Sequence, residues 1–190
     1  MFTRPTRAAA AISLSLAATL AAAQDTAAPS GAIRVGDDAP AVELPTLGGG
    51  QIDLGEAFSQ GKTVLVVLRG FPGYQCPLCS RQVGDFVDSA DAFEEAGVRV
   101  VMVYPGAEGQ LATKAEEFMA GRALPEGFTL ALDPGYDFTD AYGLRWDAPR
   151  ETAYPSTFVI DKGGRVAWAK ISKTHGGRVS AQEALAAAKD

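Results

Sequence analysis

The fold is decided by one stretch, TVLVVLRGFPGYQCPLCSRQ, which spans residues 63–82. Its first half is dominated by β-branched and aliphatic residues at both odd and even positions, which suits a strand buried on both faces. Its second half holds both cysteines of the chain, Cys76 and Cys79, with Pro77 directly after the first. The stretch therefore predicts a buried strand, a short loop and a helix that begins at the cysteines, as in an α/β fold.

The residues that follow the first cysteine have a helical period. Apolar side chains recur at spacings of one, three and four from about Pro77 to Ala96, and Gly97 ends the run, so we expect an amphipathic helix there. Because proline has no N–H to lose, Pro77 suits the first helical position and puts Cys76 at the N-cap. The apolar stripe consists of Leu78, Val83, Phe86, Val87, Ala90 and Phe93.

The rest of the chain alternates between strand-like and helix-like segments. Short strands are expected at 41–44, 51–54 and 128–133, a buried strand at 98–105, and a hairpin over 156–171 with its turn at DKGG. Helical segments are expected at 109–122, 136–144 and 180–189, the last opening with a capping box from Ser180 to Glu183. This order predicts a central mixed β-sheet flanked by helices on both faces.

The amino-terminal residues have the composition of a secretory signal peptide. Arg4 and Arg7 precede an Ala-rich apolar run over 8–23, which is shorter than the roughly 20 residues that span a bilayer. Ala21 and Ala23 supply the small residues that favour cleavage after Ala23. We therefore expect a signal peptide at 1–23, a flexible leader at 24–32 and one domain at 33–190, located in a bacterial periplasm with no membrane attachment after cleavage.

Composition limits the classes of partner. The chain has 17 basic and 23 acidic residues, a net charge of −6, and no long run of either sign. This distribution excludes the basic surface that binds nucleic acid or anionic lipid. A hydrophobic content of 47% is enough for one sizeable core.

The position of the two thiols predicts redox chemistry. Free N–H groups at a helix N-terminus lower the pKa of a nearby thiol, so Cys76 is expected to be the exposed nucleophile. Cys79, one turn further into the helix, is then the resolving thiol, which attacks the mixed disulfide or sulfenic acid formed at Cys76.

Two other interpretations of the cysteine pair remain open. An inert disulfide over so short a loop would gain little stability, because the entropy gain grows with loop length. A zinc site needs two more ligands, and the single histidine, His175, lies far away in the sequence. Redox activity is therefore favoured over a structural disulfide or a metal site.

Four further segments carry a family resemblance. They are VGDDAPAVELPTLGGGQIDL at 35–54, GKTVLVVLRG at 61–70, LDPGYDFTDAYGL at 132–144 and STFVIDKGGRVAW at 156–168. With these segments the chain resembles the peroxiredoxin-like branch of the thioredoxin superfamily, which includes alkyl hydroperoxide reductases and thiol-specific antioxidant proteins. The resemblance implies a thioredoxin-like fold, a peroxidatic role for Cys76 and a match of Cys79 to the second thioredoxin cysteine.

The active-site pattern departs from that family at two positions. Gly73 stands where peroxiredoxins carry a Thr or Ser, and Pro155 stands where they carry an arginine, as in thioredoxin, whose proline there is cis. We expect Tyr74, Pro77 and Pro155 to support the cysteine pair. The arginines that could replace the missing one are Arg69, Arg81, Arg145 and Arg150.

Two reactions fit this combination of scaffold and thiols, and peroxide reduction is favoured over protein disulfide exchange. In the first, Cys76 reduces a peroxide and becomes a sulfenic acid, Cys79 condenses with it, and an external thioredoxin-like dithiol reduces the disulfide. In the second, Cys76 attacks a protein disulfide and Cys79 releases the product. Neither needs a cofactor. A non-catalytic thioredoxin-fold module is the third alternative.

Overall fold

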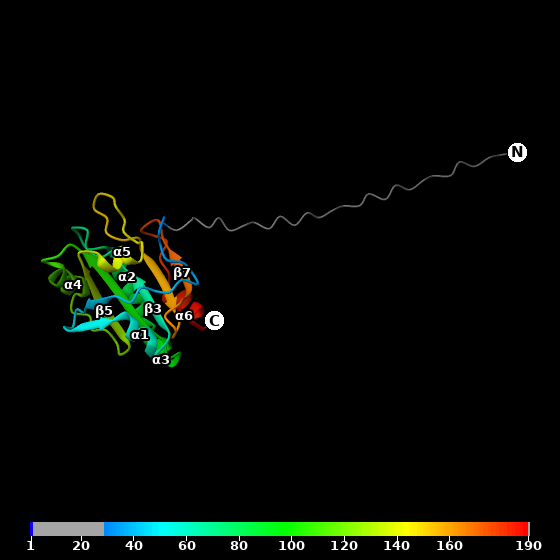
Figure 1. The fold of residues 1–190 in the computed structure, drawn as a ribbon, viewed down its shortest axis with the longest axis horizontal. Helices are drawn as coiled ribbons and strands as arrows, with labels where there is room; N and C mark the ends of the chain where they lie inside the picture. The colour runs from blue at the N-terminus through cyan, green and yellow to red at the C-terminus, as the bar shows by residue number, and fades with distance from the viewer. Residues whose placement is uncertain (2–28, 190) are drawn as a thin grey trace.

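The computed structural model of the chain describes Met1 and residues 29–189 (Figure 1). The expected signal peptide, after its first residue, and most of the expected leader therefore lie outside the described residues. Ala32, the last residue of that leader, is buried, and the N–H of Ile33 donates to the carbonyl of Tyr142 over 3.3 Å.

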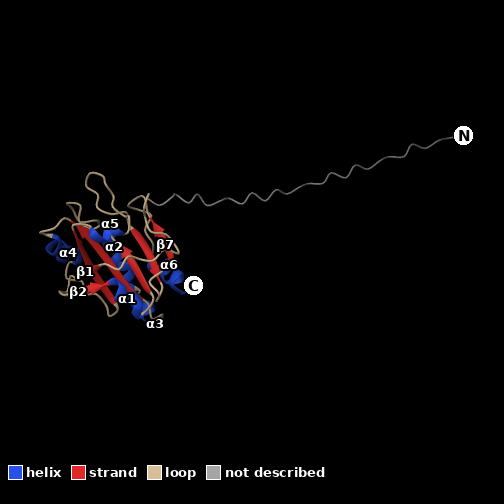
Figure 2. Cartoon of the chain, in the orientation of Figure 1, coloured by secondary structure: helices blue, strands red, loops and turns tan. Residues whose placement is uncertain are grey.

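A five-stranded mixed sheet forms the centre of the molecule (Figure 2). The middle strand pairs in parallel with one neighbour and antiparallel with the other, as the alternation of segments predicted. A separate antiparallel pair is formed by β1 (Glu43–Pro45) and β2 (Gln51–Asp53). In spatial order the sheet consists of β5 (Phe128–Pro134), β4 (Arg99–Gly106), β3 (Thr63–Val67), β6 (Ser156–Ile160) and β7 (Val166–Ile171).

Helices cover both faces of this sheet, and each face has its own core. Alternate residues of β3 join different cores, because successive side chains of a strand point to opposite faces: Val64 and Val66 belong to one, Leu65 and Val67 to the other. The first core includes residues of α2 (Pro77–Asp88), α3 (Ala90–Glu95), α4 (Leu111–Met119) and α6 (Ala181–Lys189). The second includes residues of α1 (Leu54–Gln60) and α5 (Asp137–Ala141).

The long helix expected from Pro77 to Ala96 is divided in two at Ser89. The hydroxyl of Ser89 donates to the carbonyl of Asp85 over 2.9 Å, a local bond that competes with the helix backbone and bends it. The apolar stripe keeps its role across the break, since Val83, Phe86 and Phe93 are all fully buried. At the other end of the chain the capping interaction forms as expected, with the N–H of Glu183 donating to Ser180 Oγ over 3.1 Å.

The connection from β3 to α2 lies beside β4. The N–H of Phe71 donates to the carbonyl of Pro105 over 2.9 Å. Gly70, directly before it, has a φ of +68°, and a Cβ at that position would overlap the Pro105 carbonyl. Only glycine fits both requirements, so this residue sets the path by which the chain reaches the cysteines.

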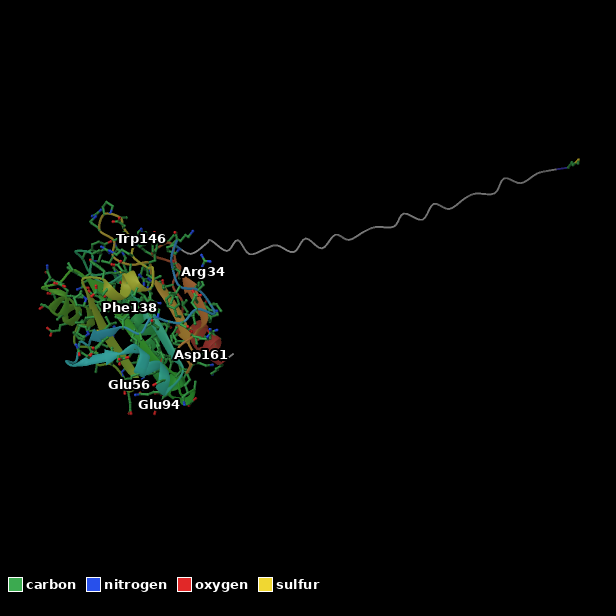
Figure 3. The ribbon with its side chains drawn as sticks, in the orientation of Figure 1. Arg34, Glu56, Glu94, Phe138, Trp146 and Asp161 are labelled. Carbon is green, nitrogen blue, oxygen red and sulfur yellow. The ribbon has the colours of Figure 1, made fainter. Side chains whose placement is uncertain are left out.

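The loop containing Trp146 lies at one end of the molecule, and Glu56 and Glu94 lie at the opposite end (Figure 3). Within the described residues, no helix is both long enough and apolar enough to cross a membrane.

Candidate active site at the start of helix α2

Cys76 caps the N-terminus of α2 with its sulfur. The residue has extended backbone angles, φ −89° and ψ 109°, and Pro77 follows it as the first residue of the helix. Its Sγ accepts a hydrogen bond from the backbone N–H of Cys79 over 3.4 Å. Both thiols are reduced. The helix start therefore has the geometry that the sequence predicted.

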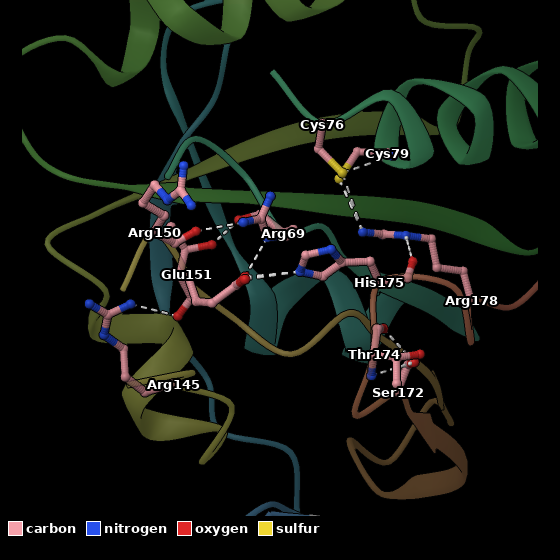
Figure 4. A network of polar contacts seen from close by, with 11 residues as sticks. Arg69, Cys76, Cys79, Arg145, Arg150, Glu151, Ser172, Thr174, His175 and Arg178 are labelled. Carbon is pink, nitrogen blue, oxygen red and sulfur yellow. Dashed lines mark hydrogen bonds and ion pairs between the residues drawn. The ribbon is translucent and has the colours of Figure 1, made fainter. Parts of the chain in front are cut away.

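Cys76 is buried, however, and the expectation of an exposed nucleophile is wrong. The residue is 3% exposed and Cys79 is fully buried. The segment 172–179 between β7 and α6 contributes to this burial, because it places Arg178 against the sulfurs (Figure 4). Nothing in the sequence periodicity indicated that this loop would cover the cysteines.

Arg178 is the charged group closest to the thiols. Its Nη2 lies 3.3 Å from Cys79 Sγ and 3.7 Å from Cys76 Sγ. Two further bonds fix the guanidinium: Nη1 donates to Gln82 Oε1 over 2.9 Å, and Nε donates to the carbonyl of His175 over 3.0 Å. None of the ion pairs among the described residues includes Arg178. Its nearby acceptors are thus two neutral oxygens and the two sulfurs.

The surroundings give the two thiols opposite acidities. The hydrogen bond from the Cys79 side chain lowers the pKa of Cys76 to about 5, with help from the Cys79 N–H and the charge of Arg178, although burial opposes the shift. Burial raises the pKa of Cys79, and the hydrogen bond to Cys76 raises that pKa further. These opposite shifts favour the thiolate form of Cys76, with Cys79 as its hydrogen-bond donor.

Among the described contacts, the bonds from an arginine side chain to the sulfurs come from Arg178 and from none of the four arginines named from the sequence. Arg69 is buried and paired with Glu151, while Arg81 is exposed on α2. Arg145 lies over the ring of Tyr136, 3.6 Å from its centroid. The carbonyl of Arg150 accepts a bond from Arg69. Arg178 was missed because it stands alone in an irregular segment, and its one signal is its place two residues before Ser180, the capping residue of α6.

Tyr74 and Pro155, two of the residues expected to support the cysteines, differ in their exposure and in the residues that they contact. Tyr74 is 43% exposed, and its ring centroid lies 4.8 Å from the guanidinium carbon of Arg69. Pro155 is buried directly before β6, and its peptide bond is trans, unlike that of thioredoxin. The Pro155 carbonyl accepts a bond from the N–H of Ser172 over 2.8 Å. Pro155 thus contacts the beginning of the segment that carries Arg178.

A second polar cluster lies beside the thiols and contains His175, the residue considered as a metal ligand. Its Nε2 lies 3.0 Å and 3.2 Å from the two carboxylate oxygens of Glu151. The other partner of that carboxylate is Arg69 Nε, 2.5 Å from Oε2. Burial opposes ionisation of Glu151, but the bonds from Arg69 and His175 hold its pKa below the usual value. Among the described residues, no group of three or more metal-ligating side chains is present.

The residue before Cys76 is also fixed. Gln75 accepts a bond from the hydroxyl of Tyr104 over 2.8 Å and donates to the carbonyl of Lys114 over 2.8 Å. These bonds connect the approach to the helix with β4 and α4. The position of the Cys76 sulfur is therefore determined from both sides of the residue.

A mixed sheet with helices on both faces, and a pair of reduced thiols at the start of the helix after its middle strand, defines a thiol protein of thioredoxin-like fold. Comparison with known proteins is more specific. The chain belongs to the Redoxin family, whose model matches residues 34–185. The peroxiredoxin relationship that the sequence motifs suggested is thereby confirmed, and the relatives below agree with it.

The relatives cover most of the chain. The putative peroxiredoxin Rv2521 of Mycobacterium tuberculosis is 30% identical over 150 residues, covering 76% of this chain and 89% of the relative. Peroxiredoxin Bcp of Bacillus subtilis is 29% identical over 147 residues, covering 73% and 87%.

Solved structures show the same fold. Peroxidoxin BcpB of M. tuberculosis matches with a TM-score of 0.63 at 23% identity, covering 83% of this chain and 97% of that one. Reduced Prx3 of Vibrio vulnificus matches with a TM-score of 0.67 at 23% identity, covering 83% and 99%. The expected thioredoxin-like fold is confirmed.

Proposed function

We propose that the chain is a thiol-dependent peroxidase that reduces hydroperoxides through Cys76 and Cys79. One observation carries the proposal: the guanidinium of Arg178 contacts the sulfurs of two adjacent thiols with opposite pKa shifts. A thiolate is the reactive form of cysteine, and a neighbouring cation stabilises it. Membership of the Redoxin family and the peroxiredoxin names of the relatives support the same reaction class.

In the first step the Cys76 thiolate attacks one oxygen of the hydroperoxide. The S–O bond forms as the O–O bond breaks, Cys76 becomes a sulfenic acid, and the departing oxygen takes a proton and leaves as an alcohol or water. The guanidinium of Arg178 lies 3.7 Å from the attacking sulfur, beside the negative charge that moves toward that oxygen. A fixed cation in a site with little water stabilises such a transition state.

In the second step Cys79 attacks the sulfur of the sulfenic acid. A disulfide forms, and the hydroxyl of the sulfenic acid leaves as water with the proton of Cys79. An external dithiol, of the thioredoxin-like kind expected from the sequence, then returns two electrons by exchange through a mixed disulfide. The cycle uses the two cysteines of this chain and the external dithiol, and it needs no cofactor.

The burial of the thiols disfavours the alternative substrate, a protein disulfide. Such a substrate must bring its own sulfur into line with Cys76, and both cysteines lie beneath Arg178 with almost no exposed surface. A hydroperoxide needs only its two oxygen atoms to reach the sulfur. In the reduced protein, the size of the group that must enter therefore favours a hydroperoxide as the oxidant over a protein disulfide, whereas the external dithiol reacts only with the oxidised protein.

The test is rapid mixing of the reduced protein with hydrogen peroxide, followed by tryptophan fluorescence and compared with a free thiol. We expect oxidation far faster than that of the free thiol, lost in Cys76→Ser, with a sulfenic acid that can be trapped in Cys79→Ser. Oxidation no faster than the free thiol would refute the peroxidase proposal and would lead to insulin reduction as the next assay.

A further inference from the structure

The segment that carries Arg178 is fastened to the rest of the molecule by a histidine. Residues 172–179 connect β7 to α6 and include two consecutive glycines, Gly176 and Gly177, directly before Arg178. Glycine restricts the backbone less than any other residue. The position of the guanidinium therefore depends on contacts outside this part of the backbone.

We propose that His175 is a positioning residue, whose bond to Glu151 holds this segment so that Arg178 meets the two sulfurs. The inference rests on the proposed function, in which Arg178 stabilises the Cys76 thiolate. His175 itself is not assigned a contact with substrate.

Glu151 is a fixed point for such a bond. Its side chain is 13% exposed and receives Nε of Arg69, which is itself only 1% exposed. Arg69 is held in turn by the carbonyl of Arg150 and by the ring of Tyr74, and its own carbonyl accepts the hydroxyl of Thr152. The carboxylate is thus bound to a buried cation that belongs to the chain just after β3, the strand that leads to Cys76.

His175 connects that fixed point to Arg178 through two different groups. Its imidazole Nε2 faces the carboxylate of Glu151, and because a carboxylate only accepts, the ring nitrogen donates. Its backbone carbonyl accepts the bond from Arg178 Nε over 3.0 Å. One residue therefore joins the Arg69–Glu151 pair to the guanidinium at the thiols (Figure 4).

A second contact keeps Arg178 near the site when this connection is lost. Gln82 on α2 accepts from Nη1 over 2.9 Å, and its own Nε2 donates to the carbonyl of Val179 over 3.1 Å. Loss of the His175 bond should therefore loosen Arg178 and not remove it. The expected effect on the thiolate is smaller than that of deleting the Arg178 charge.

The experiment compares His175→Leu with His175→Gln. Glutamine carries an N–H donor that can reach Glu151, whereas leucine carries none. Both substitutions remove the ring that packs edge-on against Trp146, 5.3 Å between centroids, so the loss of that contact cancels in the comparison. Folding of each variant is measured separately by thermal unfolding.

The readout is the titration of Cys76 in the reduced protein, followed by the ultraviolet absorbance of its thiolate. In His175→Leu we expect the ratio of thiolate to thiol, at a pH near the midpoint, to fall about two- to tenfold, in the range of coupling within one network. His175→Gln should stay close to the unmodified protein. A purely structural role would instead lower thermal stability in both variants and leave the titration unchanged.

A double-mutant cycle identifies the route of the effect. If His175 acts through Arg178, His175→Leu should not change the titration further when Arg178→Met is already present. Additive effects of the two substitutions, or a normal titration in His175→Leu alone, would overturn the inference. Because no peroxide is added, a failure here is distinct from a failure of the peroxidase proposal.

Discussion

At the scale of single residues, the difference in pKa between the two cysteines depends on the direction of the hydrogen bonds between them. Cys79 donates to Cys76 through its backbone N–H, and its side chain is the largest cause of the lowered pKa of Cys76. Arg178 contacts both sulfurs, so its charge stabilises whichever one is ionised. The hydrogen bonds from Cys79 at the helix start decide which thiol carries the charge, and the charge of Arg178 stabilises that thiolate further.

Replacing Arg178 by Met should therefore slow oxidation by peroxide about a hundredfold, the lower end of what losing one charge-stabilising donor costs. The second-order rate constant from rapid mixing measures this. Arg81→Met is the matched control, because Arg81 lies exposed on the same helix, and its rate should equal that of the unmodified protein. Equal rates in the two variants would remove Arg178 from the mechanism.

The low pKa of Cys76 also predicts how the stability of the reduced protein depends on pH. The pKa is about 5 in the folded protein and about 8.5 for an unfolded thiol, so the unfolded chain binds one more proton between these values. The free energy of unfolding should therefore gain a term that rises with pH across this window and disappears below pH 5. Urea unfolding of the reduced protein and of Cys76→Ser measures it, and parallel pH profiles would contradict it.

At the scale of elements, the connection between β3 and α2 requires a glycine, whereas a glycine within α2 weakens the helix. Gly70 lies in the connection between them with a positive φ and no room for a side chain. Gly84 lies within α2, has no positive φ, and no atom lies within 4 Å of where its Cβ would be. The same substitution should thus have opposite effects at the two sites.

Gly70→Ala should destabilise the protein by about 3 kcal/mol or more, because it adds a collision with the Pro105 carbonyl to the cost of the left-handed backbone. Gly84→Ala should stabilise it by about 0.5–1 kcal/mol, the gain of alanine over glycine within a helix. Denaturant unfolding of both variants gives the two values. A stabilised Gly70→Ala protein would show that the described loop path is incorrect.

At the scale of the whole molecule, the sheet and the start of the site could be predicted from sequence, whereas the covering segment could not. The apolar runs around Val66 and Val101 and the helical period after Pro77 are local signals, and they gave the mixed sheet and the place of Cys76. The break at Ser89 depends on one hydroxyl bond that has no periodic signature. Arg178 and His175 approach the cysteines from about 100 residues away in sequence, through contacts that only the folded chain creates.

The expected signal peptide at 1–23 predicts that the protein is exported. We propose that the signal peptide is removed after Ala23, because small residues precede that bond and a short Ala-rich run precedes them. The full chain expressed in a bacterium should then be recovered from the periplasm with a mass that begins at Gln24. An uncleaved chain retained in the cytoplasm would contradict this.

The contact of Arg178 with the sulfurs also affects the return half of the cycle. A disulfide carries no charge, so oxidation removes the anion and leaves the guanidinium facing only the neutral oxygens of Gln82 and His175. Everything that stabilises the thiolate thus favours the dithiol over the disulfide and makes the oxidised protein a stronger electron acceptor. Arg178, which speeds the oxidation of Cys76 by peroxide, therefore also favours reduction of the disulfide by the external dithiol.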